Sequence, residues 1–178
     1  ATDFGKGGKV VVWADDTTHM NGQILAKGGV LGGNGGFAEI SGKVKVQADG
    51  HADLSAPQGK AGTLLLDPGS ITISTSSSDA STGMVNNGWI NTQLGLSSLI
   101  LATTDASLSI NGATQNITVG AAISWSTANT LTLTAGNNIA INSAITSSNV
   151  GGGLTLNAAG TANLANTISL TGGTLSGT

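Results

Sequence analysis

Short apolar segments recur along the chain at nearly constant spacing. In the C-terminal half, three similar triplets begin 23 residues apart: Leu108-Ser109-Ile110, Leu131-Thr132-Leu133 and Leu154-Thr155-Leu156. Two further series repeat with steps of 22 and 23 residues: Ile117, Ile139 and Ala162, and then Ile123, Ile145 and Ile168. Three segments that return in the same order once per repeat predict a coil with three strands per turn.

The N-terminal part repeats more loosely. Three blocks align at steps of 27 residues, which makes Val10, Phe37 and Leu64 equivalent positions. The larger repeat predicts longer loops at one corner of the coil, and the glycine-rich segment 28–36 is the clearest of these loops.

Within each segment, apolar residues alternate with Ser, Thr, Asn or Lys, which predicts strands with one buried and one exposed face. Such short strands are stable only when each stacks on its equivalent in the next coil. We therefore predict an all-β protein, a right-handed parallel β-helix (β-solenoid) with about 22–27 residues per coil. We expect residues 1–73 and the regular 23-residue coils of 99–178 to form one continuous solenoid, and we expect this chain to be a fragment of a longer protein.

Residues 74–98 break the repeat. After a serine-rich run, Val85, Trp89, Ile90 and Leu94 are spaced as on one face of a helix, and Gly95 is typical of a helix end. We expect a short helix or irregular excursion near 84–95, with Trp89 covering hydrophobic surface.

The composition excludes several classes of protein. Only 8% of the residues are charged, the net charge is −3, and arginine and cysteine are absent. A surface with so few cations argues against nucleic-acid binding, because displacing counterions needs basic clusters. Without cysteine there is neither a disulfide nor a thiolate metal site.

Three blocks carry a family resemblance. The segments Gly8–Asp15, Gly33–Lys43 and Ser55–Pro68 resemble the large bacterial exoproteins related to filamentous haemagglutinin. The resemblance covers roughly residues 5–73, and the remainder shares only the family's general repeat texture. It implies a secreted passenger of a two-partner system, exported through an outer-membrane transporter barrel and displayed on the cell surface as an adhesive fibre. The family's secretion-recognition domain precedes such blocks, so the resemblance places this chain in the shaft beyond it.

The titratable residues give little support for catalysis. Among nine carboxylates only Asp15 and Asp16 are a close pair, and adjacent residues of a strand point to opposite faces. His19 and His51 follow acidic residues at similar corners, but no third ligand recurs with them. We expect no catalytic residues, no metal site and no cofactor.

Tryptophan is the best candidate for ligand contact, because its ring can stack on a sugar. Trp13 and Trp125 fall at the ends of predicted strands, and we take both as candidate glycan or partner contacts. The pattern Thr130-Thr132-Thr134 would suit an ice-binding or crystal-binding face only if it recurred on successive coils, and Leu154–Asn157 keeps only part of it.

These observations favour a non-catalytic, extracellular adhesive shaft that mediates surface adhesion or the cohesion of a biofilm or filament. The expected partners are flanking coils of the same protein, like chains stacked end-to-end, and a host or matrix glycan. A β-helical carbohydrate-active or glycan-binding domain is the alternative.

Overall fold

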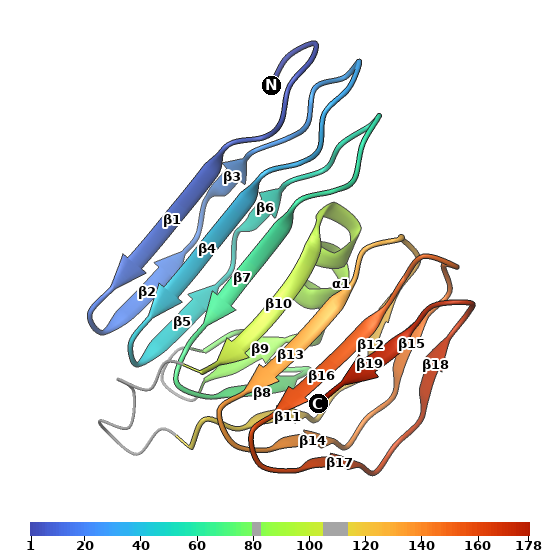
Figure 1. The fold of residues 1–178 in the computed structure, drawn as a ribbon. Coiled ribbons are helices and arrows are strands. Elements are labelled where there is room, and N and C mark those ends of the chain that lie inside the picture. Colours follow the sequence, from blue (N-terminus) through green and yellow to red (C-terminus); the bar gives the residue numbers. More distant parts are fainter. Residues whose placement is uncertain (80–82, 105–113) are drawn as a thin grey trace.

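The computed structural model describes residues 1–79, 83–104 and 114–178 (Figure 1). Parallel strands stack into ladders that run along the molecule, and the predicted parallel β-solenoid is confirmed. The longest sheet has seven strands: β1 (Lys9–Ala14), β4 (Phe37–Gly42), β7 (Thr63–Asp67), β10 (Ser98–Thr103), β13 (Leu131–Ala135), β16 (Leu154–Ala158) and β19 (Leu175–Gly177).

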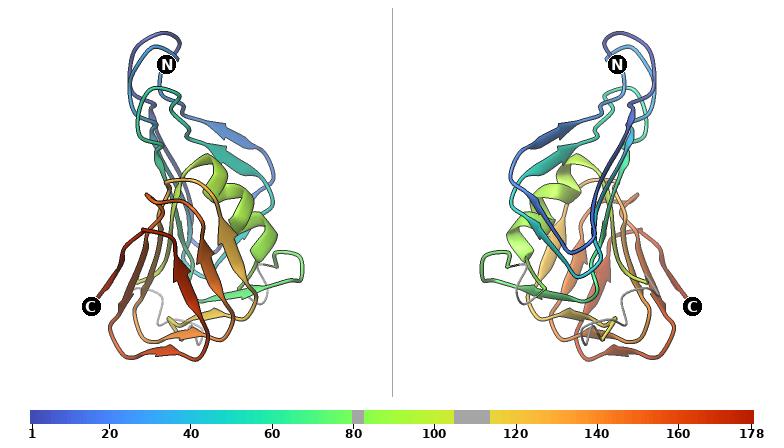
Figure 2. Two further views of the ribbon diagram at one scale, coloured as in Figure 1. Left: turned by 90° about the vertical axis from the view of Figure 1, so that its right-hand side faces the viewer. Right: turned by 90° about the vertical axis from the view of Figure 1, so that its left-hand side faces the viewer.

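Smaller sheets form the other two sides of the coils. In the first coils, β2 (Thr17–Met20) pairs with β5 (Lys45–Ala48), and β3 (Gln23–Leu25) pairs with β6 (His51–Asp53). In the later coils, one sheet contains β8 (Ile71–Ser74), β9 (Met84–Asn86), β11 (Ile117–Val119), β14 (Ile139–Ile141) and β17 (Ala162–Leu164). The other contains β12 (Ile123–Trp125), β15 (Ile145–Ser147) and β18 (Ile168–Leu170). Figure 2 shows these layers from two sides, with helix α1 along one of them.

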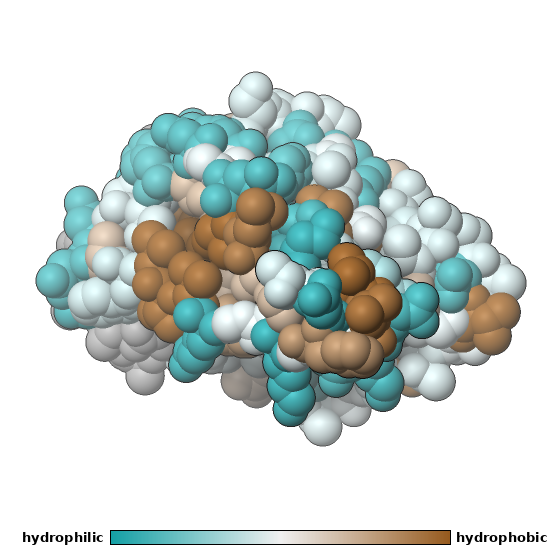
Figure 3. Space-filling model, turned by 90° about the horizontal axis from the view of Figure 1, so that it is seen from above, coloured by the Kyte–Doolittle hydropathy of each residue, from teal (hydrophilic) through white to brown (hydrophobic). Residues whose placement is uncertain are grey.

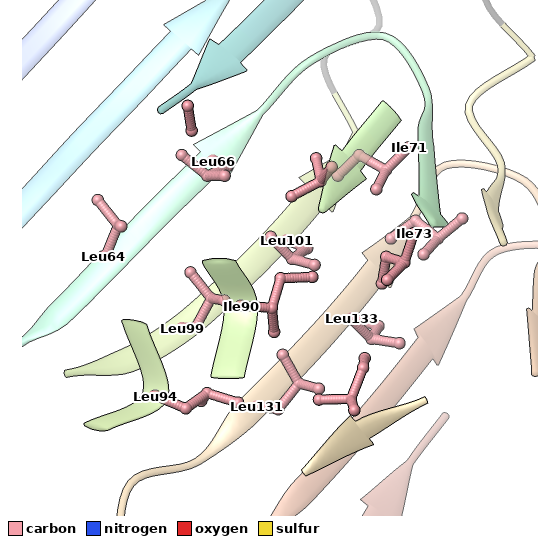
Figure 4. Close-up of a cluster of buried hydrophobic side chains, with 14 of the residues drawn as sticks. Leu64, Leu66, Ile71, Ile73, Ile90, Leu94, Leu99, Leu101, Leu131 and Leu133 are labelled. Atoms are coloured by element: carbon pink, nitrogen blue, oxygen red, sulfur yellow. The ribbon is translucent and has the colours of Figure 1, made fainter. Parts of the chain in front are cut away.

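The core consists of columns of aliphatic side chains that run from coil to coil. One column of the long sheet contains, in register, Val10, Ala38, Leu64, Leu99, Leu131, Leu154 and Leu175. Figure 4 shows its central part, where Leu64, Leu99 and Leu131 meet side chains of the helix and of the other sheets. Full burial of one such side chain contributes about 1.5–3 kcal/mol, so the columns provide the main favourable term in folding.

The isoleucine series pair as the spacing predicts. Ile117 aligns with Ile139 and Ala162, and Ile123 aligns with Ile145 and Ile168.

The predicted equivalence of Val10 and Phe37 is wrong by one residue. Val10 pairs with Ala38, while Phe37 pairs with Lys9, whose ammonium lies 5.6 Å from the centre of the Phe37 ring. The alternation of β4 explains the shift, because Phe37 and Glu39 share a face and Glu39 is charged. Phe37 and Glu39 therefore lie on the outward face of β4, and Ala38 and Ile40 point into the core.

The predicted strand Leu108–Ile110 lies outside the described residues. The strand beside β13 is β10, in which Leu99 and Leu101 pair with Leu131 and Leu133. Leu99-Ile100-Leu101 is a continuous apolar run without the alternation of the other triplets, so the constant spacing of 23 residues selected the later segment.

The predicted excursion contains strand β9 and helix α1 (Asn87–Leu96), which begins two residues after Val85. The Asn86 side chain caps the helix by accepting a hydrogen bond from the backbone N–H of Trp89. Trp89, Ile90 and Leu94 lie on the helix and are buried, but the predicted place of Val85 on the same helical face is wrong, because Val85 belongs to strand β9. Gly95 does not end the helix; Ser97 does, in an extended conformation.

Helix α1 takes the place of a strand between β6 and β12, and side-chain amides replace the missing ladder. The Gln93 amide accepts a hydrogen bond from the backbone N–H of Ala52 and donates one to its carbonyl, at 3.0 and 2.7 Å. On the opposite side, the Asn91 side chain accepts from the N–H of Ser124, and the Asn87 side chain donates to the carbonyl of Ala122. The helix therefore satisfies the edges of both neighbouring coils.

Candidate functional site

Trp13 lies on the outer face of the long sheet, at the end of β1. Half of its surface is exposed, and the Lys43 ammonium lies 5.2 Å from the centre of its ring. Lys43 also forms an ion pair of 2.8 Å with Asp15. This arrangement steadies the indole while leaving much of it open, so Trp13 keeps the geometry of a stacking surface.

Trp125 has a different environment. Its side chain is only 6% exposed, and its indole N–H donates a hydrogen bond of 2.8 Å to the backbone carbonyl of Asn129. It lies on the three-stranded sheet, whereas Trp13 lies on the seven-stranded one, so the structure does not bring the two candidates together. The burial of Trp125 leaves little ring surface for a ligand.

Two of the carboxylates are engaged in polar contacts between coils. Asp53 accepts hydrogen bonds from the Ser55 hydroxyl at 2.6 Å and from Lys27 at 2.9 Å. Burial raises the pKa of Asp53, but the hydrogen bonds from Ser55 and Lys27 outweigh it and lower the pKa below its ordinary value. The Asp15 carboxylate pairs with Lys43 of the next coil. Both side chains thus link neighbouring coils.

The two histidines lie apart. His19 belongs to β2 and pairs in register with Gln47, while His51 belongs to β6 and stacks on Trp89 with ring centres 5.7 Å apart. The Trp89 indole N–H donates to the carbonyl of Gly50, which fixes that stack. Within the ranges that the structure describes, no three His, Cys, Asp or Glu side chains are grouped as metal ligands.

Exposed large hydrophobic residues concentrate in the first and last coils. Seven of them belong to residues 1–31: Phe4, Val11, Val12, Trp13, Leu25, Val30 and Leu31. Val150, Leu164 and Leu175 are exposed in the C-terminal part. Seen from above, hydrophobic residues form patches between hydrophilic ones (Figure 3). The exposed apolar surface thus lies mainly in residues 1–31.

A groove between two corner loops escaped the sequence analysis. It has a volume of about 480 Å³ and is lined by residues that include Lys60, Ser98, Asn129 and Thr130. These residues are separated by long stretches of sequence and by irregular corner lengths, so no local motif marks them.

Neither a protein-family model nor a curated protein matches this chain. Among the described residues, no helix has the length and apolar character needed to cross a membrane.

Proposed function

We propose that this chain is a non-catalytic structural and adhesive segment of a bacterial secreted exoprotein, located at the cell surface or outside the cell. Its task is to mediate adhesion or to hold chains together in a biofilm or filament. The observation that carries the proposal is the continuous column from Val10 to Leu175, which crosses all seven strands of the long sheet. Repetition along one axis is how solenoids build extended scaffolds.

The end strands support a cohesive role. β1 and β19 are the outermost strands of the long sheet, and each leaves one row of backbone groups unpaired within it. Val12 and Leu175, whose side chains end the inward columns, are exposed. Unpaired edges beside apolar residues favour pairing with another strand. We infer that these edges pair with flanking coils of the same protein or with like chains end-to-end.

The surface chemistry supports a role without catalysis. From residue 106 to residue 178 the sequence contains no charged residue. In the N-terminal coils, the carboxylates of Asp15 and Asp53 form ion pairs with Lys43 and Lys27. Carboxylates held in this way link one coil to the next, which is a structural role.

The exposed indole of Trp13 favours glycan binding as a second candidate function. Aromatic rings stack on the apolar faces of sugars, and the adjacent Lys43 would add a hydrogen-bond donor. Such binding would extend adhesion to a host or matrix glycan.

Beads coated with this chain can be tested both for clustering, which measures cohesion, and for the cleavage of polysaccharides, which measures catalysis. We expect the beads to cluster more than beads coated with albumin, and we expect no release of reducing ends from a panel of polysaccharides. A glycan array probed in parallel with wild-type and Trp13→Ala protein tests the second function. Turnover of any polysaccharide would contradict the proposal, and dispersed beads would contradict the cohesive role.

A further inference from the structure

We infer that the groove beside Lys60 binds a carboxylate-bearing sugar, such as a uronic acid unit of an acidic polysaccharide. This inference goes beyond the proposed shaft, because occupation of the groove does not depend on contact between chains. The site rests on the shape of the groove, on its charge and on the rigidity of its walls.

The shape of the groove follows from unequal corners. Nine residues connect β6 to β7 and five connect β12 to β13, but Ser97 alone connects α1 to β10. The short corner leaves a recess between its two longer neighbours. Its volume of about 480 Å³ lies in the range of small-molecule sites, and its lining is about half polar, with Lys60, Ser98, Asn129 and Thr130 set among glycine and alanine.

The charge of the groove is positive. Of the described residues that line it, Lys60 alone is charged, and Lys60 takes part in neither of the ion pairs found in the described ranges. The opposite wall, which contains Asn129, Thr130 and Gly151, belongs to the part of the sequence without charged residues. The ammonium therefore faces no competing carboxylate there, which favours an anionic ligand.

The polar groups of the groove suit the hydroxyls of a sugar. Ser98 accepts a hydrogen bond from the backbone N–H of Thr130, and its hydroxyl hydrogen remains a potential donor. Thr130, on the wall opposite Lys60, is exposed to the groove. A uronic acid could place its carboxylate against the Lys60 ammonium and its hydroxyls against the side chains of Ser98 and Thr130.

Both walls are preorganised. The backbone N–H of Lys60 donates to the Asn34 side chain, and its carbonyl accepts from the N–H of Gly35. On the other wall, the Asn129 side chain donates to the carbonyl of Leu94, and its own carbonyl accepts from the Trp125 indole. Fixed walls lower the entropic cost of binding.

The test is titration of ¹⁵N-labelled protein with trigalacturonic acid, followed by amide chemical shifts. We expect shifts at Lys60, Ser98 and Thr130, and binding that weakens as salt is added. Maltotriose serves as the neutral probe and inorganic phosphate as the simple anion. We expect Lys60→Ala to weaken trigalacturonate binding about tenfold or more, because a charge-assisted hydrogen bond is lost.

Two further variants make the test specific. Lys45→Ala removes the same charge from β5, outside the groove, and should leave binding unchanged. Ala128→Phe fills the groove from an exposed position and should abolish binding while Lys60 remains. Absence of shifts in the groove, equal effects of the two lysine variants, or equal binding of phosphate or maltotriose would overturn the inference. Clustering of beads is measured in a separate experiment, so its result does not decide whether the groove binds trigalacturonate.

Discussion

At the residue scale, Gln93 shows how one side chain lets a helix replace a strand. It is fully buried, and its amide bonds both backbone groups of Ala52 and the hydroxyl of Ser97. A primary amide carries one acceptor and a donor group, as a peptide unit does, so it can complete the ladder at that position.

We expect Gln93→Leu to destabilise the protein by about 2–4 kcal/mol, because it leaves the buried N–H and carbonyl of Ala52 without partners. Gln93→Glu should also destabilise it, since a carboxylate cannot donate to that carbonyl. Urea unfolding measures both changes. Thr92→Ala, at an exposed position of the same helix, is the control. Equal stabilities of the Gln93→Leu variant and the wild type would contradict the role of the amide.

A second residue-scale prediction concerns Asp53. Its folded-state pKa is lowered from the ordinary value of 3.8, so its ion pair stabilises the fold above that value. The contribution is lost as the pH falls from about 3.8 through the lowered pKa. We expect the difference in stability between wild type and Asp53→Asn to shrink over this acidic range. A difference that is constant with pH, measured by thermal unfolding, would show that the carboxylate charge is not responsible.

The roles of Gln93 and Trp125 were beyond sequence reasoning for a common reason. Gln93 bonds a residue 41 positions away, across a corner whose length varies from coil to coil. Trp125 stands at the end of a three-residue strand, where the following loop folds back to accept its N–H. Periodicity locates a strand but does not specify the path of the corner that follows it.

At the element scale, α1 and β9 join two kinds of coil. Strand β9 pairs with β8 at the edge of the five-stranded sheet, and α1 lies between β6 and β12. Among the described strands, those of the long sheet alone form a ladder that is continuous between the N-terminal and C-terminal coils. The helix and the extra strand thus fill the other two sides where the larger coils meet the smaller ones.

Two glycines should respond in opposite ways to substitution by alanine. Gly95 is an exposed residue of α1 with open space at its Cβ position, so Gly95→Ala should stabilise the protein by about 0.5–1 kcal/mol. A Cβ at Gly62 would overlap the backbone oxygen of Gly36 in the preceding coil, so Gly62→Ala should destabilise it by roughly 2 kcal/mol or more. Denaturation midpoints measure both. A stable Gly62→Ala variant would contradict the close stacking of these corners.

Strands with regular spacing were predictable, and their register less so. Ile123, Ile145 and Ile168 align because the corners between them have nearly constant length. Phe37 did not align with Val10, because the charge of Glu39 decides which face of β4 points outward. Repeat spacing reflects the average length of the loops, whereas the register of two neighbouring strands depends on the length of the particular loop between them.

At the scale of the whole molecule, the central claim is that the two ends are complementary surfaces of one cohesive shaft. The inward columns reach Val12 on β1 and Leu175 on β19. A contact between β1 of one chain and β19 of the next would be head-to-tail, so it would generate filaments rather than closed pairs.

Lysine at either end should block this contact, because a charged edge resists strand pairing. We expect the Val12→Lys and Leu175→Lys variants to be monomeric alone. Mixed together they should form dimers and nothing larger, since each retains the end that the other has lost. Circular dichroism of each variant checks that the fold is intact.

Light scattering across a wide range of concentration tests the central claim most directly. We predict that the average mass of the wild-type chain rises with concentration from its monomer mass of 17.3 kDa, and that the mixture of the two lysine variants stops at twice that mass. A wild-type chain that stays monomeric at every concentration would contradict end-to-end cohesion.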